Sequence, residues 1–217
     1  NYMAMAGWKP QQMIDGISGI MSLAAASGED LGTTSDIVTD AITAFGLTAG
    51  DAGHFADVLA QASANANTDV SMLGESFKYV APVAGAMKYS IEDTSLALGL
   101  MASANVKGSM SGTALKTSIA NMVKPTNDMA EAMDKYGISI TDGEGNLKSL
   151  KGVIDNVRGS LGGLSRDEQT AVASTIFGKE AMAGMLAIVN ASEEDYNKLS
   201  NAIYNANDAA EDMADTM

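Results

Sequence analysis

A repeat of 42 residues in the first 125 positions constrains the fold of this 217-residue sequence more than any other feature. Three residues of types that begin helices are each followed four positions later by leucine: Ser27 with Leu31, Asp69 with Leu73, and Ser111 with Leu115. The capping-box pairs Thr48 with Asp51 and Ser90 with Asp93 recur at the same spacing. A unit of this length that holds two capped apolar stretches predicts a helical hairpin, and stacked hairpins form a solenoid-like body.

Apolar residues recur at helical spacing through most of the chain. Before Pro125 they predict three hairpins, with helices at 10–24 and 31–45, 48–67 and 71–87, and 90–105 and 111–123. After Pro125 the repeat stops, and helices are predicted at 127–136, 150–161, 165–177, 179–189 and 192–206. Residues 207–217 are either a frayed end or the start of a longer helix. The predicted fold class is therefore mainly α.

One segment of the second part alternates like strands instead of helices. Residues 138–141 and 147–150 flank a glycine-rich turn, which predicts a small β-hairpin at about 138–150. Asp142 and Asn146 give the turn some likeness to a calcium loop, but the glycine and glutamate spacing of an EF-hand is absent. We therefore expect a turn. The predicted organisation is residues 1–125 as three hairpin repeats and residues 126–217 as a short helix, the β-hairpin and C-terminal helices. We expect the two parts to form one compact unit of a longer chain.

The charge of the chain excludes a nucleic-acid-binding role. Lysine and arginine number 13 against 27 aspartate and glutamate, which gives a net charge of −14. From residue 1 to 77 the only Lys or Arg is Lys9, against nine acidic residues. Nucleic-acid binding depends on cations that replace the counterions of phosphates. The chain also has no cysteine, and its longest uncharged stretches, such as 16–28, are shorter than the 18 to 20 or so residues of a membrane-spanning helix.

The sequence offers no catalytic set. His54 is the single histidine, so a zinc site with two imidazoles is excluded, and no nucleophile motif stands near it. Its pattern fits a surface or hairpin-packing histidine. Carboxylates such as Glu75 and Glu92 lack the aromatic platform of a sugar cleft, and residues 106–113 lack the order of a phosphate-binding loop. We expect no enzyme activity, no cofactor and no metal.

Several short motifs occur in the order in which they stand in one known protein family. They are FGL at 45–47, ADVL at 56–59, LGESF at 73–77, YVAP at 79–82, VKGSMSGTALK at 106–116, and IFGKEA at 176–181. With these motifs the chain resembles phage tail tape measure proteins, in the core region known as phage minor tail protein. The match extends over nearly the whole sequence.

The resemblance implies a structural module of the virion, made in the bacterial cytoplasm and located in the tail lumen. Such proteins take part in tail assembly and length determination and are expelled during DNA ejection. The implied partners are tail tube and tail-tip or baseplate proteins, tail assembly chaperones and further copies of the chain, with a trimer as one possibility. Two family motifs contain the candidate interaction or turn residues: Lys107, Gly108, Ser109, Gly112, Thr113, Phe177, Gly178 and Lys179.

Two other functions stay open at this point. The ejected segment could act on a membrane and help DNA to cross the host envelope, since alanine-rich amphipathic helices can insert at an interface. It could also be a peptidoglycan hydrolase domain, which the single histidine disfavours.

Overall fold

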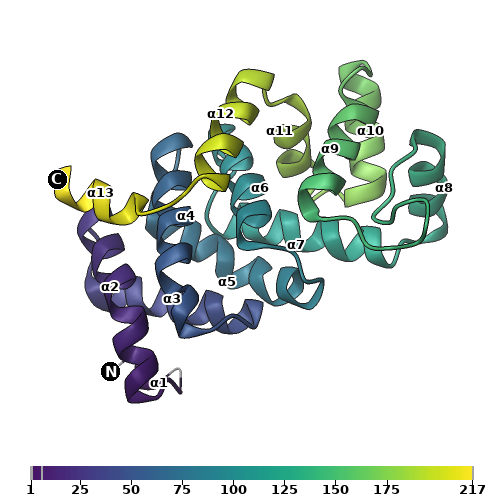
Figure 1. Ribbon diagram of the computed structural model, residues 1–217. Helices are drawn as coiled ribbons and strands as arrows, with labels where there is room; N and C mark the ends of the chain where they lie inside the picture. Colours follow the sequence, from purple (N-terminus) through teal and green to yellow (C-terminus); the bar gives the residue numbers. More distant parts are fainter. Residues whose placement is uncertain (1, 6, 217) are drawn as a thin grey trace.

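The helices of the first 125 residues alternate between two rows (Figure 1). The computed structural model describes residues 2–5 and 7–216. The first row contains α2 (Pro10–Ser27), α4 (Ala52–Asn65) and α6 (Ile91–Ser103). The second row contains α3 (Leu31–Phe45), α5 (Val70–Ala86) and α7 (Ser109–Val123). A short helix α1 (Tyr2–Met5) packs on α3, and a 3-10 turn η1 (Ala49–Asp51) precedes α4.

The rest of the chain turns at one end of the two rows and then returns along them. Helices α8 (Asn127–Tyr136), α9 (Leu150–Leu161) and α10 (Arg166–Phe177) follow α7. Helices α11 (Met182–Asn190), α12 (Glu193–Tyr204) and α13 (Ala209–Thr216) then form a third layer on the first row. Helix α12 packs on α4 and α6, and α13 packs on α2 and α4. Both ends of the chain therefore lie on the left of Figure 1.

Small residues let the helices of the second row approach closely. A Cβ atom at Gly85 of α5 would overlap the carbonyl oxygen of Ala44 in α3, and one at Gly112 of α7 would overlap the carbonyl oxygen of Ser76 in α5. Large side chains then fill the space between the rows. Phe55 and Phe77 are both buried and meet edge to face, with ring centroids 5.4 Å apart. Phe45 adds a second edge-to-face contact with Phe77, with ring centroids 6.0 Å apart.

The helix starts of the second row repeat at 39 residues, so the predicted spacing of 42 is wrong for these caps. Helices α3, α5 and α7 begin after Asp30, Asp69 and Gly108. Ser27 instead ends α2, where its hydroxyl donates to the carbonyl of Leu23 at 2.7 Å. Ser111 lies inside α7. The carboxylate of Asp30 takes the capping role and accepts from the amides of Gly32 and Thr33 at 3.1 and 2.8 Å.

The three leucines of the repeat do not share one environment. Leu73 and Leu115 are each 1% exposed, inside α5 and α7. Leu31 is the first residue of α3 and is 48% exposed. In the 42-residue register α3 begins three residues later than α5 and six residues later than α7. Leu31 therefore falls on the first turn of α3 and not on its buried face. The expected equivalence is wrong at Leu31.

The predicted β-hairpin at 138–150 is also wrong, because no strand forms in the part of the chain that the structure describes. Only an isolated bridge joins Thr141 and Leu147. Backbone donors that would extend a ladder are taken by side chains: the amide of Ser139 donates to Oδ1 of Asn156 at 2.9 Å, and that of Thr141 donates to the Ser139 hydroxyl at 3.1 Å. The segment is a loop with one bridge.

Two aspartates of the first row fasten the returning layer. Asp57 of α4 accepts from the backbone amides of Asp208 and Ala210 at 3.0 and 2.9 Å, and so caps the start of α13. Asp93 of α6 accepts from the amide of Lys151 at 2.8 Å, at the start of α9, and from the hydroxyl of Tyr204 in α12. Only one of the two hydrogen bonds of the predicted capping box at Ser90 therefore forms. The Ser90 hydroxyl accepts from the amide of Asp93, but the Asp93 carboxylate bonds α9 and α12 instead of the amide of Ser90.

Candidate interaction surface

The first candidate motif forms the turn that begins α7. Gly108 has a positive φ of 61° and is the residue before the helix. Its carbonyl oxygen accepts from the hydroxyls of Ser76 and Ser111 at 2.9 and 3.0 Å, and these two hydroxyls lie 2.8 Å apart. Both serines are buried. Together with the close approach at Gly112, this network fixes the start of α7 against α5.

The second candidate motif lies between α10 and α11. Phe177 is fully buried, and Gly178 has a positive φ of 86° that directs the chain into the next helix. The side-chain amide of Asn121, on α7, donates to the carbonyl oxygen of Phe177 at 2.9 Å. Gly184 of α11 lies against Ala114 of α7. The second motif is therefore held directly on the helix that the first motif begins.

The fold brings the two motifs together along one groove of about 260 Å³. Its lining residues are Val106, Ser109, Met110 and Thr113 from the start of α7, and Glu180, Ala183 and Gly184 from the start of α11. We refer to these seven residues as the motif groove. Met110 is 63% exposed, although it is apolar.

The eight candidate residues separate into structural and exposed positions. Gly108, Gly112 and Phe177 are buried, and Gly178 is half-buried with its left-handed φ; these four maintain the backbone and the core. Ser109 and Thr113 line the motif groove. Lys107 and Lys179 do not line the groove. Lys107 follows the lining residue Val106, and Lys179 precedes the lining residue Glu180. The ammonium group of Lys107 donates to the carbonyl oxygen of Asn67 at 3.3 Å, and Lys179 is exposed.

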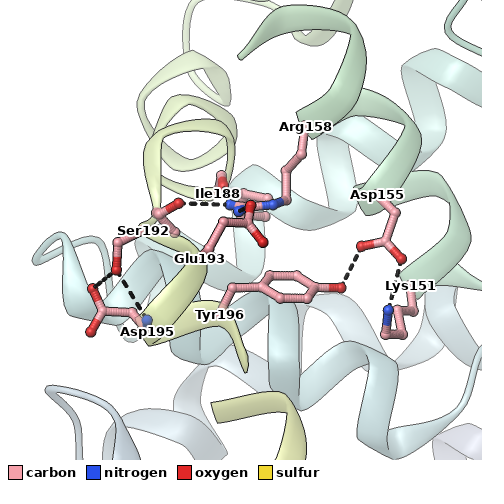
Figure 2. A network of polar contacts seen from close by, with 9 residues as sticks. Lys151, Asp155, Arg158, Ile188, Ser192, Glu193, Asp195 and Tyr196 are labelled. Atoms are coloured by element: carbon pink, nitrogen blue, oxygen red, sulfur yellow. Dashed lines mark hydrogen bonds and ion pairs between the residues drawn. The ribbon is translucent and has the colours of Figure 1, made fainter. Parts of the chain in front are cut away.

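A second polar cluster lies where α9 faces the corner between α11 and α12 (Figure 2). Nη1 of Arg158 donates to the carbonyl oxygens of Ile188 and Ala191 at 2.6 and 3.0 Å, and Nη2 pairs with Glu193 at 2.7 Å. The guanidinium carbon stands 4.6 Å from the ring centroid of Tyr196. Arg158 thus caps the end of α11 and holds the start of α12, which is a structural task.

Figure 2 also shows how Tyr196 closes this cluster. Its hydroxyl donates to Asp155, which pairs with the ammonium group of Lys151 at 2.7 Å. Burial raises the pKa of Tyr196, and the hydrogen bond to Asp155 raises the pKa of Lys151. Both groups therefore keep their protons at neutral pH. The cluster lines a cavity of about 450 Å³, but its charged groups are already paired with one another or with backbone.

His54 and Asp142, which the sequence raised as possible site residues, are each held by neighbouring groups. His54 is half exposed and pairs with Glu92 of α6 at 2.5 Å, which matches the expected hairpin-packing histidine. Within residues 2–5 and 7–216, no three His, Asp or Glu side chains gather closely enough to hold a metal ion. Asp142 uses its carboxylate to accept from the amides of Glu144 and Asn146, each at 2.9 Å, as the expected turn requires.

The two motifs are recognisable in the sequence, but the groove between them is not. The roles of Met110 and Glu180 depend on α11 returning to α7, and no local pattern signals that return. The same is true of Asn121, whose partner Phe177 is 56 residues away. Among the described helices, none is both long enough and apolar enough to cross a membrane.

Comparison with known proteins supplies the family. Residues 1–178 match the family described as phage-related minor tail protein. A tape measure protein of Pneumococcus phage Dp-1 is 39% identical over 215 residues, which are 99% of this chain and 19% of that protein. A probable tape measure protein of Escherichia phage P2 is 25% identical over 174 residues, which are 79% of this chain and 21% of that protein.

The chain spans about a fifth of the length of these two curated relatives. No solved structure matches it. The resemblance inferred from the short motifs is confirmed by the family match and by the names of the relatives. The chain therefore belongs to the family of phage-related minor tail proteins, together with proteins named as tape measure proteins.

Proposed function

We propose that this chain is a folded, non-catalytic module of a phage tape measure protein, which works in tail assembly and length determination. The observation that carries the proposal is the 39% identity over 99% of the chain to a protein named as a tape measure protein. The three-layered helical body supports a structural role, because its polar clusters fasten helices to one another. The module is a folded station along a much longer protein.

We place the module in the tail lumen and expect it to leave ahead of the genome. Its net charge of −14 supports this part of the proposal, because an acidic surface repels the phosphates of DNA that must pass through the same channel. A protein that held DNA in the lumen would oppose ejection.

The proposed partners are the tail tube, tail-tip or baseplate proteins, tail assembly chaperones and further copies of the chain. We assign contact with one of these partners to the motif groove, with Lys107 and Lys179 beside it. Both lysines belong to residues 78–190, the part of the chain in which basic residues equal acidic ones in number. Charge at the rim of an interface steers association even when it adds little affinity.

The first test is charge reversal at the two lysines. Lys107→Glu and Lys179→Glu are expected to leave the melting temperature of the 217-residue chain within a few degrees of the parent and to lower the yield of complete tails. Lys198→Glu is the matched control, because Lys198 is also exposed but lies on α12, away from the motif groove. Calorimetry measures the melting, and electron microscopy of particles counts the tails.

The outcomes separate the two interpretations of the motifs. Unchanged melting with failed assembly supports an interface at the motif groove. Unchanged melting with normal tails refutes it. Loss of stability in Lys107→Glu, whose ammonium group bonds the carbonyl of Asn67, would assign the motif to the structure of the turn instead.

A further inference from the structure

Helix α2 has an apolar face that no described element covers. Ile14, Ile17 and Met21 are 66%, 41% and 53% exposed, and their spacing of three and then four residues places them on one side of the helix. We refer to these three residues as the α2 stripe. Helix α2 is the edge of the first row, and its packing partners are α3, α4, η1 and α13. Figure 1 shows its outer side facing away from the rest of the molecule.

The spacing of the α2 stripe fits a helix as its partner. Alternation of three and four residues is the seam that two helices share when they pack lengthwise with knobs in holes. The opposite side of α2 is already covered by a helix, since α2 packs on α4 within the first row. A helix on the α2 stripe would extend that row by one member. In the second row the corresponding edge is already covered, because α1 packs on α3.

The charge around this edge decides which kind of helix fits. Residues 1–77 contain nine acidic residues and one Lys or Arg, and residues 191–217 contain seven acidic residues and one Lys. Residues 78–190 contain eleven acidic and eleven basic residues. The whole net charge of −14 therefore belongs to the two end segments. The fold brings these segments together, because α13 packs on α2 and α4. Exposed acidic residues on these two helices are Asp15 on α2 and Glu211, Asp212 and Asp215 on α13.

We propose that the α2 stripe binds an amphipathic helix of a partner protein, with an apolar seam and flanks rich in lysine or arginine. Charge complementarity supports this occupant: its cations would face the acidic end segments while its seam covers Ile14, Ile17 and Met21. A second copy of the chain would bring two acidic edges together, and an anionic membrane surface would be repelled. The thirteen described helices include no further helix that could cover the stripe.

The experiment uses the 217-residue chain and two synthetic three-heptad helices. Both peptides have leucine at the seam; one carries lysine at the flanking positions and the other carries glutamate. Fluorescence anisotropy of the labelled peptides measures binding. The lysine peptide is expected to bind, more weakly as salt rises, and the glutamate peptide is expected not to bind.

Two variants locate the binding. Ile14→Gln with Met21→Gln removes the apolar contact without a change of charge and keeps a residue that favours helix. The double variant is expected to bind the lysine peptide with an affinity lower by about tenfold or more, equivalent to about 1.4 kcal/mol. Val123→Gln is the matched control, because Val123 is 44% exposed on α7 at a distance from the stripe, and it should bind like the parent. Unchanged circular dichroism verifies that both variants fold.

Four results would overturn the proposal. The first is equal binding of the lysine peptide by the parent and the double variant. The second is equal binding of both peptides. The third is a parent that sediments as a dimer and becomes monomeric in the double variant, which would make a second copy the occupant. The fourth is binding of the parent, but not of the double variant, to vesicles of anionic phospholipid in the absence of peptide, which would make the stripe a membrane contact.

Discussion

At the scale of single residues, the side chain of Asp93 connects helices that are far apart in the sequence. It is 5% exposed and accepts from the amide of Lys151 and the hydroxyl of Tyr204. These partners are 58 and 111 residues away along the chain. Burial, followed by this hydrogen bond, raises the pKa of Tyr204, so its hydroxyl remains a donor at neutral pH.

Replacing Asp93 by alanine is expected to lower the free energy of unfolding by about 2–3 kcal/mol, because two donors lose a charged acceptor. Asp134→Ala is the control: Asp134 is exposed on α8, and its replacement is expected to change stability by less than about 0.5 kcal/mol. Urea denaturation measures both variants. Equal midpoints for the two would show that Asp93 does not fasten the third layer.

The carboxylate of Asp142 gives the loop at 142–146 a dependence on pH. Hydrogen bonds from the amides of Asn146 and Glu144 lower the pKa of Asp142 from its ordinary value of 3.8. A lowered folded pKa means that the contact stabilises the loop above the ordinary value and is lost as pH falls through the folded one. Amide exchange at Glu144 and Asn146, corrected for intrinsic rates, should therefore speed up at acidic pH. Asp142→Asn, which can still accept, should remove this pH dependence; the same dependence in that variant would rule out Asp142 as its cause.

At the scale of elements, close helix contacts make some glycines irreplaceable and leave others free. A Cβ at Gly112 would overlap the Ser76 carbonyl oxygen, whereas a Cβ at Gly159 in α9 would meet no atom within 4 Å. Gly112→Ala is expected to destabilise the fold by about 1–3 kcal/mol through overpacking. Gly159→Ala is expected to stabilise it by about 0.5–1 kcal/mol, because alanine favours helix. Thermal melting distinguishes the two, and a stabilising Gly112→Ala would contradict the packing of α7 on α5.

The helices themselves were largely predictable, because their signals are local. Apolar spacing and flanking caps predicted 127–136 and 150–161, which are the bounds of α8 and α9. The register of the repeat was not predictable, since Ser27 and Asp30 are both capping types and only the left-handed turn at Gly28 decides between them. The β-hairpin failed for a similar reason: Asn156, which takes the amide of Ser139, is 17 residues away.

At the scale of the whole molecule, the sequence predicted stacked hairpins but not the layer that returns over them. That layer depends on contacts such as Asp57 with Asp208, 151 residues apart, for which no short pattern exists. The motif groove depends on the same return, so its two motifs were visible and their meeting was not. The acidic excess of residues 1–77 is evident from the sequence, but its position beside the acidic C-terminal segment depends on the packing of α13 on α2 and α4.

Protease protection in purified particles tests the central claim most directly. If the chain is a module of a tape measure protein in the tail lumen, its peptides should be present in intact particles of the phage that encodes it. They should resist an added protease there and be digested once the tails are triggered to eject or are taken apart. Peptides that are missing from purified particles, or that are digested equally fast in intact and disrupted ones, would contradict the account.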